Sequence, residues 1–167
     1  MKNIRLFFIA ALIFISGTTF AQVEKYMAAF TYQICKATTW PNESPEFRIG
    51  IVGTSPISQY FKQMSKAKKM GDKPIKFIQW ENVNEITSCQ ALFIPQTAME
   101  QWGQIQKKLE NKPVLIFTND AGVAKKDVTI SFEIIDNKIR YNLNKSDLTE
   151  RKLRIQSTIE RMALKVY

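Results

Sequence analysis

The amino-acid sequence predicts an α/β protein, a three-layer Rossmann-like sandwich whose mostly parallel sheet carries an antiparallel hairpin at one edge. Three observations predict this fold. Short apolar runs alternate with amphipathic helical patterns from residue 47 to residue 117, as they do in βαβ units. The run Phe47–Val52 stops at Gly53, as the first strand-to-helix turn of such a sheet does. From Val128 onward the apolar residues alternate strictly, which is typical of a hairpin.

The first expected element after the N-terminal segment is a helix over residues 23–37. Its apolar residues recur at gaps of four and three, and Trp40-Pro41 ends the pattern. Ser55 is expected to cap the next helix, and Pro56 to occupy its first position, where a missing N–H costs nothing. We expect strands at 47–52, 75–80, 91–94 and 114–117, separated by helices at 57–64, 83–86 and 99–109.

The pattern changes after Phe117. No helix fits between Phe117 and Val128, where the sequence has the composition of a loop. Strands are expected at 128–134 and 139–143, joined by a turn at Asp136-Asn137. A last helix is expected over 155–166, because its apolar residues recur at gaps of four, three and four.

Residues 1–21 have the pattern of a secretory signal peptide that is cut after Ala21. Lys2 and Arg5 make a positive start, an apolar run follows from residue 6 to residue 15, and small residues precede Gln22. A retained membrane anchor is the alternative, but this apolar run is too short to span a bilayer of about 30 Å. We therefore expect one exported, periplasmic domain over residues 22–167.

The chain is basic, with 24 Lys and Arg against 15 Asp and Glu, a net charge of +9. A solvated helix face is the ordinary interpretation of such charge. Attraction to an acidic partner or to a membrane surface is the alternative, whereas an exported protein is not expected to bind nucleic acid. The basic residues cluster at Lys62, Lys66, Lys68, Lys69 and Lys73, and again at Lys107, Lys108 and Lys112.

The sequence offers little to an enzyme. It has no histidine, so the commonest general base and metal ligand is absent, and Ser-His-Asp and Cys-His machinery is excluded. Neither a dinucleotide fingerprint nor a phosphate-binding loop is present, and the acidic residues are scattered among loops. We expect no enzyme, no cofactor and no metal. A catalyst that uses paired carboxylates is the least favoured alternative.

Binding is the stronger expectation. In open α/β sheets, ligands gather beyond the carboxyl ends of the strands, where backbone N–H groups and short polar side chains are available. These residues would either hold a small polar or anionic molecule or only cap helices and complete turns. The candidates are Gly53, Thr54, Ser55, Gln96, Thr97, Thr118, Asn119 and Asp120.

Cys35 and Cys89 would lie in an oxidising compartment. If strands 47–52 and 91–94 are neighbours, both cysteines sit toward the amino-end edge of the sheet. A disulfide there would be worth roughly 4 kcal/mol in the chain-entropy model. A pair of buried free thiols is the equal alternative.

Six stretches, in order over residues 24–165, together resemble the YfiR family. Each stretch is short, and it is their order and coverage that make the resemblance specific. They are Tyr26–Tyr32 with Lys36 and Trp40-Pro41, Phe47–Gly53, Cys89–Ile94, Lys112–Leu115 with Asp120–Ala124, Ile139–Asn144, and Leu153–Ala163. The chain departs from the family pattern at Lys126-Asp127, where relatives usually have a glycine pair, and at Gln156, where they have a serine.

The resemblance implies a small periplasmic α/β protein that regulates a membrane-bound signalling protein, a diguanylate cyclase of cyclic-di-GMP signalling or a sensor histidine kinase. It would do so by binding the partner's periplasmic sensor region, which needs differential affinity for two partner states and no catalytic group. A homodimer is an open alternative for its assembly. The alternative function is a periplasmic small-molecule-binding protein that senses or delivers a ligand.

Overall fold

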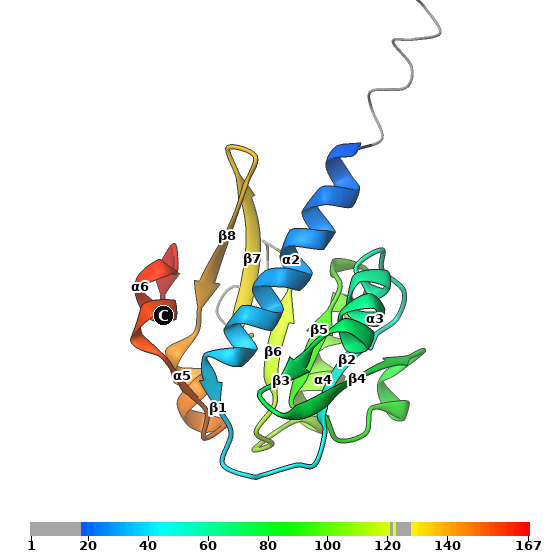
Figure 1. The fold of residues 1–167 in the computed structure, drawn as a ribbon. Coiled ribbons are helices and arrows are strands. Elements are labelled where there is room, and N and C mark those ends of the chain that lie inside the picture. The colour runs from blue at the N-terminus through cyan, green and yellow to red at the C-terminus, as the bar shows by residue number, and fades with distance from the viewer. Residues whose placement is uncertain (1–17, 121, 123–127) are drawn as a thin grey trace, which may run out of the picture.

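The computed structural model describes residues 18–120, 122 and 128–167. In these residues eight strands form one sheet in the order β10-β8-β7-β6-β5-β2-β4-β3, and β1 pairs with β9 beside it (Figure 1). The sheet strands are β2 (Phe47–Val52), β3 (Lys69–Met70), β4 (Lys73–Trp80), β5 (Ala91–Ile94), β6 (Leu115–Thr118), β7 (Ile130–Ile135), β8 (Lys138–Leu143) and β10 (Lys165–Val166). The separate pair is β1 (Thr38–Thr39) with β9 (Arg154–Ile155).

The strands β4, β2, β5, β6 and β7 run parallel, and β8 returns antiparallel to β7. The α-helices are α2 (Thr18–Lys36), α3 (Ser58–Ala67), α4 (Trp102–Lys108), α5 (Lys145–Glu150) and α6 (Ser157–Met162). Two 3-10 helices, η2 (Val83–Glu85) and η3 (Gln96–Gln101), complete the connections. The predicted α/β sandwich with a mostly parallel sheet is confirmed.

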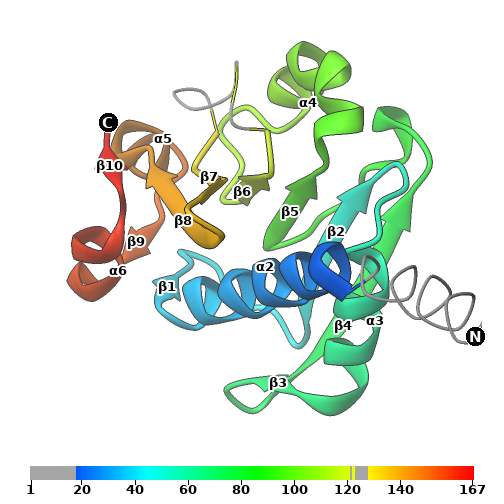
Figure 2. The ribbon, with the colours of Figure 1, turned by 90° about the horizontal axis from the view of Figure 1, so that it is seen from above.

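The two faces of the sheet bury different helices, which makes the three layers. Alternate residues of one strand point to opposite faces. Ile49 and Ile51 therefore join a cluster with α2 and α3, whereas Val52 joins one with α4, η2 and η3. Figure 2 shows α2 and α3 on one side of the sheet and α4 on the other. Gly50 lies between these residues of β2, and the Trp80 ring rests against it where a side chain would otherwise stand.

Most of the expected strands and helices are present within a few residues of their predicted ends. The turn at Asp136 and Asn137 has φ angles of 50° and 59°, which suit a tight hairpin turn. The hairpin is not the last part of the sheet, because β10 pairs with β8. The loop predicted between Phe117 and Val128 includes residues 121 and 123–127, which lie outside the described residues.

The predicted helix over 155–166 is wrong. This segment is divided into β9, α6 and β10, and its end is held by backbone pairing: Tyr167 N–H donates to Leu143 O at 2.8 Å, and Lys145 N–H donates to Tyr167 O at 2.9 Å. Met162, which belongs to the supposed apolar stripe, is 61% exposed. Edge pairing with β8 and β1 overrides a periodicity that fits a helix only by its spacing.

Two helix starts also differ from expectation. Ser58 N–H donates to Ser55 O at 3.0 Å, so a turn precedes α3, and Pro56 lies in this turn rather than at the first helical position. Ser55 Oγ accepts a hydrogen bond from Ile57 N–H at 3.4 Å, and no side chain caps the start of α3, so the predicted cap is wrong. The helix expected at 99–109 begins as η3 at Gln96 and becomes α-helical only at Trp102.

A buried ion pair between Asp147 and Arg151 connects α5 to the segment that precedes β6. Arg151 Nε donates to Asp147 Oδ1 at 2.7 Å, and Arg151 Nη1 donates to Leu109 O at 3.0 Å. The other carboxylate oxygen of Asp147 accepts from the Thr129 hydroxyl, which itself accepts from Ile116 N–H. The two charged side chains are thereby tied to the segments that enter β6 and β7.

The two cysteines are free and buried, and they belong to clusters on opposite faces of the sheet. Burial raises the pKa of Cys89 to about 12 and also raises that of Cys35, so very little thiolate forms at neutral pH. The alternative of a disulfide between Cys35 and Cys89 therefore disagrees with the structure.

We expect the native protein to be almost inert to a thiol reagent such as dithionitrobenzoate at pH 8, and the denatured protein to release colour for both cysteines. The physical reason is the combined loss of access and of thiolate on burial. Two thiols that react at once in the native state would contradict the burial. No thiols after denaturation without a reductant would establish the disulfide instead.

Candidate functional site

Several of the residues predicted to hold a ligand at the carboxyl ends of the strands form hydrogen bonds with one another or with their own loop. Asn119 Oδ1 accepts a hydrogen bond from Gln96 N–H at 2.8 Å, which ties the loop after β6 to the loop after β5. Thr118 Oγ1 accepts from Asp120 N–H at 3.1 Å, and Asp120 Oδ1 accepts from Gly122 N–H at 2.6 Å. These groups are therefore engaged in loop structure, the ordinary role that the sequence left open for them.

Gly53 fills a conformational role. Its φ of +76° lies in the region that favours glycine, and its carbonyl oxygen accepts from Gln79 Nε2 at 3.0 Å. Thr54 and Ser55 line a cavity of about 450 Å³, with Pro56, Ser58, Gln59 and Gln79. The other predicted residues, Gln96, Thr97, Thr118, Asn119 and Asp120, are not part of its lining. Ser58 Oγ is buried and has no hydrogen-bond partner among the described residues.

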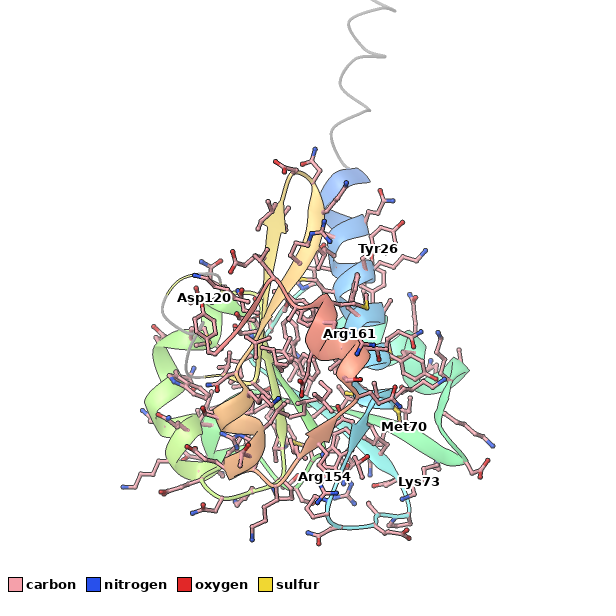
Figure 3. The ribbon with its side chains drawn as sticks, turned by 90° about the vertical axis from the view of Figure 1, so that its left-hand side faces the viewer. Tyr26, Met70, Lys73, Asp120, Arg154 and Arg161 are labelled. Carbon is pink, nitrogen blue, oxygen red and sulfur yellow. The ribbon has the colours of Figure 1, made fainter. Side chains whose placement is uncertain are left out.

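A different site stands out on the face that α2 covers: a groove between the N-terminal half of α2 and the β7–β8 hairpin. We call it the hairpin groove. In Figures 1 and 3 the helix and the hairpin run side by side and project past the end of the sheet. The groove has a volume of about 500 Å³. Its lining is mainly apolar: Gln22, Val23, Tyr26, Phe30, Ile134, Asn137, Lys138 and Ile139.

The walls of the hairpin groove expose large apolar side chains. Tyr26 is 49% exposed and Ile134 is 53% exposed. Val23 and Phe30 pack partly on the core and form the floor on the α2 side. An exposed apolar patch with polar groups at its rim is typical of a surface that binds another molecule.

The local sequence explains why this end of the hairpin leaves the core. Along β7 the residues change from buried at Ile130 to exposed at Ile134 and Ile135, because the hairpin extends beyond the strands that cover its base. Two sequence signals could have revealed the groove. Ile134 continues the apolar alternation of Ile130 and Phe132 toward the hairpin turn. Tyr26 comes three residues after Val23 and four before Phe30, so it extends their apolar side of the helix.

The described residues lack the elements of other kinds of site. They contain no group of three or more acidic or cysteine side chains that could hold a metal ion. Among them there is also no helix that is long and apolar enough to cross a membrane. The hairpin groove has one Lys and two amide side chains among its lining residues, and the rest of its lining is apolar.

Fold and groove together define a Rossmann-like α/β domain with an exposed apolar groove. The family profile DUF4154, described as YfiR/HmsC-like, matches residues 24–163, so the chain belongs to this family. The family supports a role as a periplasmic regulator of signalling, and it is regulatory rather than catalytic. No match is found among curated proteins.

A solved structure agrees on the fold. It is titled as an ABC domain in complex with L-Trp from Streptococcus pneumonia, and it superposes with a TM-score of 0.61 at 14% sequence identity. The match covers 84% of this chain and 60% of the other, so this chain spans less than two thirds of the other's length. At this identity the likeness concerns the fold alone.

Proposed function

We propose that this protein regulates a membrane-bound signalling protein, a diguanylate cyclase or a sensor histidine kinase, by binding its periplasmic sensor region through the hairpin groove. The observation that carries the proposal is the exposed apolar wall of Tyr26 and Ile134 in a member of a regulatory family. A regulator of this kind shifts its partner's equilibrium by binding one state more tightly, and an apolar contact surface is sufficient for that.

Export fits the same proposal. Cleavage after Ala21 would release a single domain over residues 22–167, and α2 would then begin at Gln22, on the rim of the hairpin groove. The free N-terminal end of α2 would lie beside the surface that receives the partner. A homodimer is an open alternative for the assembly. The number of copies of this protein in the complex with its partner would distinguish a dimer from a monomer.

We expect Tyr26→Glu combined with Ile134→Glu to abolish capture of the partner by immobilised mature protein from detergent-solubilised inner membranes. Both side chains are about half exposed, so the variant should fold, while two carboxylates in an apolar contact should lower affinity at least about a hundredfold. Mass spectrometry identifies what is retained, and titration with the partner's isolated periplasmic region measures the affinity.

Met162→Glu is the matched control, because Met162 is an even more exposed apolar residue that does not line the hairpin groove. It should bind as well as the natural protein. If no cyclase or kinase with an extracytoplasmic region is retained, or if the control fails equally, the proposal is wrong.

The second candidate function is the binding of a small polar molecule in the cavity beside Thr54 and Ser55. The specific observation in its favour is the buried, unpartnered Ser58 Oγ, which a ligand hydroxyl or carboxylate would satisfy. A complex with the membrane partner that forms without any small molecule would separate the first function from the second.

A further inference from the structure

Five lysines gather at the end of α2 that lies away from the hairpin groove. We call this cluster the lysine corner: Lys36, Lys66, Lys68, Lys69 and Lys73. They come from three separate elements, the last turn of α2, the end of α3 with the residues that follow it, and the β3–β4 turn region. Figure 2 shows the ends of α3 and β3 projecting from the body of the domain, and Figure 3 shows Met70 and Lys73 well below Tyr26.

Tyr32 contacts three of the five lysines. Its ring lies 5.9 Å from Lys36 Nζ and 4.7 Å from Lys68 Nζ, measured to the ring centroid. Its hydroxyl donates to Lys69 O at 2.9 Å, which fixes β3 to α2. The pairing of Met70 with Lys73 then holds Lys73 next to the others. The fold thus assembles positive charges that are scattered in the sequence.

Their charge is not neutralised within the domain. None of the five ammonium groups is within ion-pair distance of a carboxylate in the part of the chain that the structure describes, although Glu46 pairs with Arg48 and Lys76 close by. Asp72 is the one acidic residue between Lys66 and Lys76. Like charges held together without counter-charges attract an anionic partner.

The surroundings favour a flat anionic surface over an acidic peptide. The cavity next to the corner, of about 390 Å³, is lined by Lys36 and Lys73 but also by Glu43 and Glu46, whose carboxylates would repel an acidic chain lying in it. The large apolar side chains that are exposed in the described residues all lie elsewhere, so the corner has nothing to insert into hydrocarbon or into an apolar pocket.

We propose that the lysine corner binds the surface of an anionic lipid bilayer, at the level of the headgroups and without insertion. Each lysine near such a surface contributes about 1 kcal/mol, close to a fivefold factor in partitioning. A protein that acts on a membrane-bound partner would be concentrated where the partner is. Vesicles contain no partner protein, so this proposal and the proposed function succeed or fail separately.

The test is co-sedimentation of the mature protein with vesicles of phosphatidylglycerol and phosphatidylcholine, compared with vesicles of phosphatidylcholine alone. We expect binding to the anionic vesicles only, and release at high salt because the attraction is electrostatic. Lys66→Gln, Lys68→Gln and Lys69→Gln together should lower the partition coefficient on the order of a hundredfold. The same three positions changed to Arg should keep it.

The matched control removes three exposed lysines outside the corner, with Lys107→Gln, Lys112→Gln and Lys152→Gln. It has the same net charge as the first variant and should bind within about threefold of the natural protein. Equal loss in both variants would show that net charge alone is at work and would overturn the proposal. So would the absence of binding to anionic vesicles, or corner-dependent binding to polyglutamate in place of them.

Discussion

Gly50→Ala is expected to destabilise the domain by about 3 kcal/mol, measured as the free energy of unfolding in urea. A methyl group at this position would overlap the six-membered ring of Trp80, with its Cη2 atom at 2.6 Å and its Cζ3 atom closer still. Trp80 is buried among η2, η3 and α4, so the ring has no free space to enter. Overpacking in a filled core typically costs about 1–3 kcal/mol because neighbours must leave their rotamers, and an overlap with a buried ring lies at the upper end of that range.

Two further substitutions serve as controls for the overlap with Trp80. Trp80→Leu removes the ring, so Gly50→Ala should cost far less in that background, and the double-mutant cycle should show strong favourable coupling. Gly103→Ala in α4 meets nothing within 4 Å and should raise stability by up to about 1 kcal/mol. If Gly50→Ala unfolds at the same urea concentration as the natural protein, the packing of Trp80 on β2 is not as described.

Arg151→Met is expected to lower the free energy of unfolding by about 3–5 kcal/mol. Asp147 is only 7% exposed and Arg151 only 6%, so the variant leaves a buried carboxylate without its cation. It also leaves Leu109 O and Lys112 O without the Nη1 group that binds both. Chemical denaturation measures the loss, and combination with Asp147→Asn should recover part of it because no buried charge then remains.

The pH dependence of this loss has a definite sign. Burial already raises the pKa of Asp147 in the native protein, against the opposing effect of Arg151, and removal of Arg151 raises it further. A carboxyl whose pKa is higher in the folded state than in the unfolded state favours folding at low pH and loses that contribution as the pH rises. The deficit of Arg151→Met should therefore be smaller at about pH 4 than at about pH 8. A deficit that is equal at both would argue that packing, not charge, dominates.

How much of this could be predicted from the sequence depends on the range of the interactions involved. Strands such as 47–52 and 91–94 were predictable because local preference and burial on both faces agree in an apolar run that ends at a turn residue. The C-terminal segment was not, because Ile155 and Val166 owe their conformation to the distant strands β1 and β8. Spacing within the segment carries no information about those partners.

For the sites as well, the sequence showed the local chemistry but not the contacts between distant residues. The chemistry of Thr118, Asn119 and Asp120 was visible, but whether a ligand or a neighbouring loop satisfies it depends on the contact between Gln96 and Asn119, which are 23 residues apart. The hairpin groove joins residues 23–30 with 134–139, so only the folded chain shows that their apolar side chains face one space. The lysine corner likewise required Tyr32 to bring α2 and β3 together.

The length of α2 has a consequence for any receptor of this protein. Thirteen residues separate Val23 from Lys36, which at 1.5 Å per residue is about 20 Å of rigid helix. With one end resting on phospholipid headgroups, the opposite end would hold its docking surface at that height. A receptor whose external portion is a loop of a few residues would be out of reach. One with a folded ectodomain, or with helices that continue for several turns past the bilayer, would meet it.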